Sequence, residues 1–168
     1  MRRRTFIAAG LGGTLALAGA GLWWNKKFAL PARNAVFTQE SRLLFAALIP
    51  AVIGAPNGKT LSTTQINAAV DRVFQTIAQL PLLTQDEIGE LLGLLQITAV
   101  RKLLAVSASW TEASPEELAH FLQSWRTHPI ALLQSAYLAL HDLISGSYYA
   151  DTSTWAAIGY PGPAVQFV

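Results

Sequence analysis

Apolar residues recur every three or four positions through most of the chain after residue 37, which is the spacing of one face of an α-helix. Prolines, glycines and polar residues divide the pattern into five segments, and no hairpin dipeptide separates alternating apolar and polar positions. The five stripes are Leu44, Phe45, Leu48 and Ile49; Ile66, Val70, Val73, Ile77 and Leu80; Ile88, Leu91, Leu92, Leu95 and Ala99; Leu118, Phe121, Leu122 and Trp125; and Ile130, Leu133, Tyr137, Leu140 and Ile144. We therefore predict an all-α fold in which about five helices form a single compact domain over residues 38–146.

Capping patterns mark where these helices begin and end. A hydroxyl side chain before a helix accepts from its first free amides, and a Glu or Gln three residues later can complete a capping box. The sequence places such starts at Thr38, Ser62–Gln65, Thr84–Glu87 and Ser114–Glu117. Stops are expected at Pro50 with the Gly54–Gly58 loop, at Pro81 and at Gly146. The helix opening at Thr84 is expected to be the longest.

Residues 147–168 form a segment of different character, which we predict to be an irregular C-terminal tail. Large aromatic rings stand there among glycine and proline, and Asp151 is the segment's one charged residue. Two interpretations remain open: the rings cover the domain's own core, or they form a docking surface, because Tyr and Trp dominate interface energies. The candidate partner-binding residues are Tyr148, Tyr149, Trp155, Ile158, Tyr160, Pro161 and Pro163.

The first 24 residues stand apart from the helical domain, and residues 25–37 read as a linker. Arg3 and Arg4, followed by Phe6 and then a Gly- and Ala-rich apolar run, resemble a twin-arginine export signal. A general secretory signal or a plain anchor is the alternative. Ala18–Ala20 has the form of a cleavage site, whereas the length of the apolar run and the Trp pair at its end favour an uncleaved anchor. We expect a periplasmic protein tethered to the inner membrane.

Composition narrows the chemistry of the domain. The chain has no cysteine, which excludes disulfides, thiolate metal sites and cysteine nucleophiles. Five of the 12 basic residues lie in or beside the leader, and the remainder carries an excess of acidic residues, so no nucleic-acid partner is expected. The histidines His120, His128 and His141 lack the spacing of a metal set. We predict no catalytic residue, no metal site and no cofactor in this chain.

Several short segments of the chain resemble those of a known protein family. They are Phe45–Pro50, Leu122–Arg126, Leu140–Leu143, Tyr148–Tyr149 and Trp155–Pro163. Together they resemble the small subunit of membrane-associated bacterial sugar and alcohol dehydrogenases, the gluconate 2-dehydrogenase subunit 3 type. The resemblance extends loosely over residues 38–163, and Trp155–Pro163 is its most specific part. This chain departs from some members of that family in being shorter and lacking cysteine.

The resemblance implies a non-catalytic subunit, not an enzyme. Its large partner would be an FAD-dependent enzyme of the glucose-methanol-choline oxidoreductase class, often joined by a cytochrome c subunit. Such a subunit would escort the flavoprotein through the twin-arginine pathway, tether it and stabilise it. The alternative from the residues alone is an independent, membrane-anchored helical adaptor or binding protein.

Overall fold

A computed structural model describes residues 36–103, 106 and 109–163 of this chain. The export-signal residues Arg3, Arg4 and Phe6 and nearly all of the linker lie outside the described residues. Within the described part, no helix has both the length and the apolar character needed to cross a membrane.

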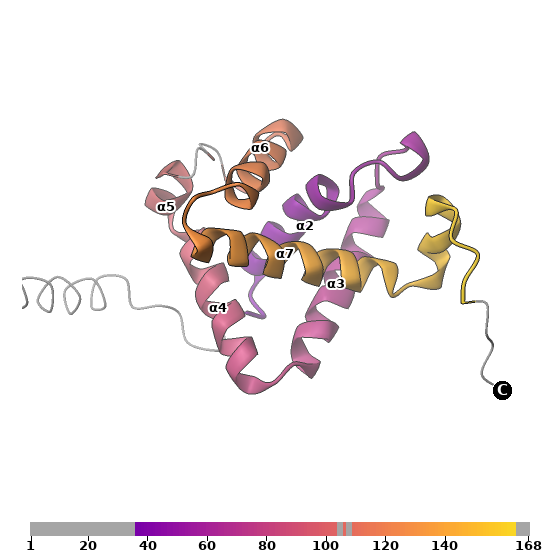
Figure 1. The fold of residues 1–168 in the computed structure, drawn as a ribbon, viewed down its shortest axis with the longest axis horizontal. Helices are drawn as coiled ribbons and strands as arrows, with labels where there is room; N and C mark the ends of the chain where they lie inside the picture. Colours follow the sequence, from indigo (N-terminus) through magenta and orange to yellow (C-terminus); the bar gives the residue numbers. More distant parts are fainter. Residues whose placement is uncertain (1–35, 104–105, 107–108, 164–168) are drawn as a thin grey trace, which may run out of the picture. The chain divides into compact units, whose positions relative to one another are not determined.

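The described residues form helices joined by short loops, without a β-strand among them, which confirms the all-α prediction (Figure 1). The α-helices are α2 (Gln39–Ile53), α3 (Thr63–Gln79), α4 (Leu82–Gln96), α5 (Thr98–Leu103), α6 (Pro115–Arg126) and α7 (Ala131–Tyr149). Two 3-10 helices complete the set, η2 (Pro56–Gly58) and η3 (Thr152–Ile158). The longest helix is α7 with 19 residues, not the helix predicted to open at Thr84.

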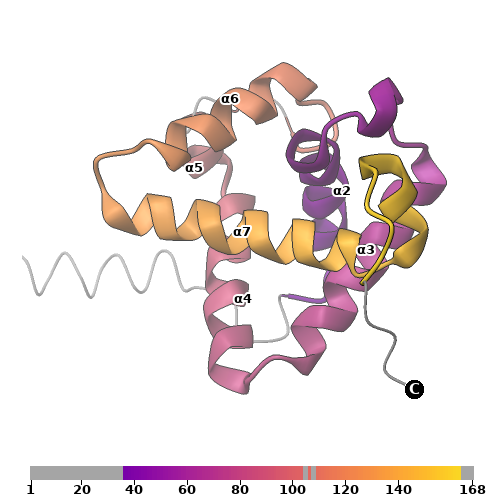
Figure 2. The same ribbon diagram turned by 45° about the vertical axis from the view of Figure 1, so that its right-hand side comes forward.

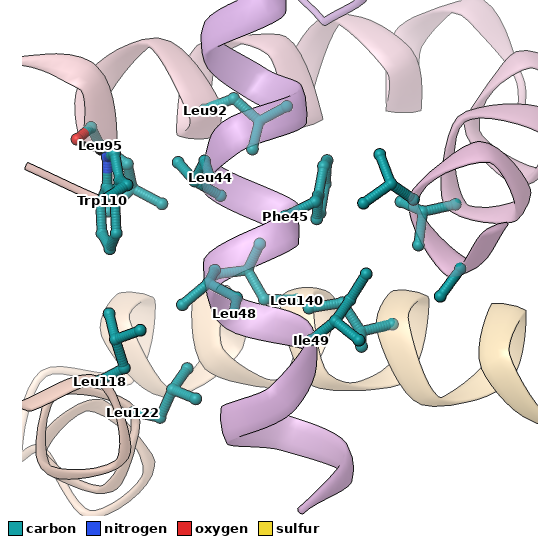
Figure 3. Close-up of a cluster of buried hydrophobic side chains, with 14 of the residues drawn as sticks. Leu44, Phe45, Leu48, Ile49, Leu92, Leu95, Trp110, Leu118, Leu122 and Leu140 are labelled. Atoms are coloured by element: carbon teal, nitrogen blue, oxygen red, sulfur yellow. Dashed lines mark hydrogen bonds between the residues drawn. The ribbon is translucent and has the colours of Figure 1, made fainter. Parts of the chain in front are cut away.

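Helix α2 lies at the centre of this arrangement and packs against α3, α6 and α7. Its stripe of Leu44, Phe45, Leu48 and Ile49 is completely buried, as the sequence predicted. Figure 3 shows Leu44 and Leu48 pointing toward one side of α2 and Phe45 toward the other. Because this buried face is broad, several helices can pack on α2 in one common core.

Trp110, which the sequence analysis did not single out, closes the core between α4 and α6. Its Nε1 donates a hydrogen bond to the carbonyl of Leu95 over 3.2 Å, and its ring meets Phe121 edge to face at 5.9 Å. Leu95 lies in the last turn of α4, where the backbone carbonyls accept no hydrogen bond from an amide of the same helix. The indole therefore fills the core and satisfies a helix end together (Figure 3).

Three of the predicted helix starts are confirmed. The Thr38 hydroxyl accepts from the amide of Ser41, and complete capping boxes form at Ser62 with Gln65 and at Ser114 with Glu117. The predicted burial of the α6 stripe, Leu118, Phe121, Leu122 and Trp125, is also confirmed.

The predicted start at Thr84 is wrong, because α4 begins two residues earlier at Leu82. Pro81 supplies the first carbonyl of the helix, to which the amide of Gln85 donates. The buried side chain of Gln85 turns back and donates to the carbonyl of Leu80 over 2.8 Å. It thus satisfies a free carbonyl at the end of α3.

Two predicted stops need correction, one in part and one entirely. Helix α2 ends at Gly54, whose φ is 73°, in agreement with the predicted Gly54–Gly58 loop, but it continues through Pro50, where a stop was also predicted. Helix α7 continues through Gly146 to Tyr149, since this extension buries Ser147 and Tyr148 against the domain. Burying one large side chain stabilises by about 2 kcal/mol, which exceeds the cost of about 1 kcal/mol for a glycine inside a helix.

Gly146 and Gly54 therefore form a matched pair for a stability test. A Cβ added to Gly146 meets no atom within 4 Å, so Gly146→Ala is expected to raise stability by about 0.5–1 kcal/mol. Gly54 also has open space but adopts a positive φ, so Gly54→Ala is expected to lower stability by about 1–3 kcal/mol. Thermal unfolding of both variants measures this. If Gly146→Ala destabilises, Gly146 ends the helix after all.

Candidate functional site

The predicted irregular tail is more ordered than expected. Tyr148 and Tyr149 belong to the last turn of α7, and residues 152–158 form η3. The Asp151 side chain caps η3 by accepting from the amide of Ser153 over 2.9 Å. Among the described residues of this segment, 150–151 and 159–163 lie outside a helix. The sequence analysis did not predict this cap, because it gave more weight to the glycines and prolines of the segment than to the short polar side chains at 151–154.

Two contacts fasten this C-terminal part to α3. The Arg72 guanidinium lies 2.7 Å from a carboxylate oxygen of Asp151, in an ion pair that is about three-quarters buried on the arginine side. One turn further along α3, Thr76 accepts from the buried hydroxyl of Ser147 over 2.9 Å. Arg72 and Asp151 are 79 positions apart, so no local pattern could have paired them.

Trp155 is held against the end of α7. Its Nε1 donates to the carbonyl of Tyr149 over 2.7 Å, and its ring meets Tyr160 at 5.0 Å in an edge-to-face arrangement. The amide of Tyr160 donates to the carbonyl of Trp155 over 3.0 Å. Gly162 lies close to the six-membered ring of the Trp155 indole, and a Cβ added to Gly162 would be 3.4 Å from Cζ3 of that ring. The indole therefore fixes the path of residues 159–162.

The candidate partner-binding residues separate into two groups by exposure. Tyr148 is buried in the core, and Tyr149 and Trp155 are half-buried. By contrast, Ile158 is 50% exposed and Tyr160 is 45% exposed, and Pro161 and Pro163 are also exposed. We call Ile158, Tyr160, Pro161 and Pro163 the tail surface. The inner rings thus pack on the domain, and the tail surface is exposed.

The environment of the tail perturbs two ionisable groups. Hydrogen bonds from Ser153, with a smaller effect of Arg72, hold the pKa of the Asp151 carboxyl below its usual 3.8. Burial, reinforced by Tyr149, raises the pKa of the Tyr148 phenol. At neutral pH Asp151 is therefore a carboxylate, and Tyr148 keeps its proton as a hydrogen-bond donor.

A cleft of about 460 Å³ lies on the inner side of the tail. It is bounded by η2 and the start of α3 on one side and by the end of α7 and η3 on the other. Figure 2 shows η3, in yellow, beside the purple segment that contains η2. The sequence analysis did not identify this cleft, because it is assembled from segments about 90 positions apart.

The histidines give no evidence of a catalytic centre. Among residues 36–103, 106 and 109–163, no group of three or more His, Asp or Glu side chains is placed to hold a metal ion. His141 and Asp142 do make a contact, with 3.0 Å between Nδ1 and Oδ1, although they are neighbours on α7. The Asp142 side chain is 74% exposed, so this pair lies on the surface.

Comparison of the chain with protein-family models, with characterised proteins and with solved structures finds no match.

The Asp151 contacts predict an acid-dependent loss of stability. Because folding lowers the pKa of Asp151, the resulting stabilisation is present above 3.8 and is lost as the pH falls below that value. Asp151→Asn is therefore expected to lower the melting temperature at neutral pH, with a difference from wild type that narrows in strong acid. Asp142→Asn, at an exposed site, is the control and should change little. A difference for Asp151→Asn that persists unchanged in acid would contradict this assignment.

Proposed function

We propose that this chain is a non-catalytic small subunit that docks on, stabilises and escorts an exported FAD-dependent dehydrogenase of the glucose-methanol-choline oxidoreductase class. Two sequence features support the proposal: the twin-arginine-like Arg3, Arg4 and Phe6, and the resemblance over residues 38–163 to the small subunits of such enzymes. The flavin would reside in the partner. A cytochrome c subunit and the inner membrane, reached through the N-terminal segment, complete the proposed assembly.

The observation that carries the docking proposal is the tail surface. Ile158 and Tyr160 are apolar or aromatic and about half exposed, and they follow a segment fastened by Asp151 and Trp155. A side chain that is already held in place loses little conformational entropy when a partner covers it. Rigid aromatic side chains of this kind account for much of the binding energy in protein interfaces.

The escort role follows from the chemistry of the proposed partner. A flavoprotein has to fold around its cofactor before it leaves the cytoplasm, and the twin-arginine pathway carries folded proteins. A helical domain without a cofactor gains little from that pathway on its own. One signal on the small subunit would serve both chains, provided that the two associate before export.

The test replaces a tail-surface ring and compares it with an exposed apolar side chain on another part of the domain. Tyr160→Ala is expected to weaken association with the large subunit about thirtyfold, because a hot-spot ring contributes about 2 kcal/mol or more. Leu132→Ala, at a side chain that is 74% exposed on α7, is the matched control and should bind normally. The readout is FAD recovered from the periplasm with the tagged small subunit, alongside a melting curve.

Trp155→Ala is a useful second variant with a different expected result. Trp155 donates to Tyr149 and packs on Tyr160, so its removal should both loosen the tail and reduce the recovered FAD. The exported amount of large subunit should fall in parallel with FAD in both tail variants. Equal FAD recovery for wild type, Tyr160→Ala and Leu132→Ala would contradict docking through the tail surface and leave the independent adaptor as the better description.

A further inference from the structure

The cleft beside the tail differs in charge from the rest of the domain. Lys59 and Arg72 line it, and Asp151 is the one acidic residue among its lining residues. The described residues together contain six basic and ten acidic side chains, so two of the six cations gather at this one cleft. Two further cavities of the described part contain no lysine or arginine in their linings. The cleft is therefore a positive site on a domain with net negative charge.

Asp151 does not cancel this positive charge completely. One of its carboxylate oxygens receives Arg72 and the other receives the amide of Ser153. Arg72 uses Nη1 for that ion pair, and no hydrogen bond from its Nη2 to another described residue is present. The guanidinium thus retains donors, and Lys59 is exposed with its ammonium available to a ligand.

Tyr148 adds a polar group to the wall of the cleft. The residue as a whole is only 4% exposed, and no hydrogen bond from its hydroxyl to another described residue is present. The hydroxyl oxygen is not among the fully buried atoms that lack a partner, so a ligand in the cleft can reach it. Its raised pKa keeps it protonated at neutral pH, so it can donate to a ligand oxygen.

The start of α3 also favours a negatively charged ligand in the cleft. Thr64 and Gln65 line the cleft and belong to the first turn of this helix of 17 residues. The capping box occupies the amide of Gln65, while the amides before it have no acceptor inside the helix. Free amides and the helix dipole both favour a negative group at this position.

We propose that the cleft between η2, the start of α3 and η3 binds a small oxyanion, a ligand that carries a carboxylate or phosphate group. Lys59 and Arg72 supply charge, and the Tyr148 hydroxyl donates to an oxygen of the ligand. The Ser153 and Thr154 side chains at the opposite wall provide further polar groups for the rest of the molecule. The volume of about 460 Å³ exceeds that of a bare phosphate ion and suits a ligand of small-metabolite size. This site does not depend on a flavoprotein partner.

The test titrates the purified full chain by calorimetry with inorganic phosphate and, separately, with succinate at constant ionic strength. Saturable binding of either probe at millimolar concentrations or below is expected, and the tighter probe identifies the preferred oxyanion. Tyr148→Phe removes only the hydroxyl and is expected to weaken binding roughly three- to tenfold. Lys59→Gln is expected to weaken it to a similar extent.

Each variant has a matched control in this chain. Tyr149→Phe removes a neighbouring hydroxyl that does not line the cleft, and Lys102→Gln neutralises an exposed lysine on α5. Both controls are expected to bind like wild type, and melting curves should show all four variants folded. The proposal is overturned if neither probe binds saturably, or if binding is the same in Tyr148→Phe and Lys59→Gln as in their controls.

Discussion

Burial of one broad face of α2 is the constraint on which the described fold depends. Leu44, Phe45, Leu48 and Ile49 are each fully buried, and each stabilises the fold by about 2 kcal/mol relative to an exposed side chain. A face this broad needs several neighbours, which α3, α6, α7 and Trp110 provide in one common core. The position of α7 then determines where the tail begins, because α7 packs on both α2 and α3.

The tail is an extension of this packed body. Ser147 and Tyr148 carry α7 past Gly146 into contact with α3, and the Arg72–Asp151 ion pair ties the next segment to the same helix. As a result, η3 lines the cleft through Ser153, Thr154 and Ala157, and the exposed tail surface begins at its last residue, Ile158. Two distinct proposals, protein docking and small-ligand binding, therefore rest on different residues of one short C-terminal segment.

Local sequence patterns predicted what local physics determines. Ser62 and Ser114 lie in complete capping boxes, as predicted. The recurrence of apolar residues every three or four positions identified the buried faces of α2 and α6. The pattern was misleading where tertiary contacts outweigh a local signal, as at Gly146, which α7 passes through to bury Tyr148. The cleft and the Arg72–Asp151 pair were out of reach, because their parts are distant in sequence and nothing in one segment indicates the other.

The central claim is that the tail surface contacts a flavoprotein while the opposite end of α7 does not. A photo-crosslinking amino acid at position 158, compared with one at position 132, tests this directly in intact cells of the native host. Both positions are well exposed, with 50% and 74% of the side chain accessible. The account predicts a crosslinked product that contains an FAD-binding large subunit from position 158 and none from position 132. Absence of that product at position 158, or equal yields at both positions, would contradict it.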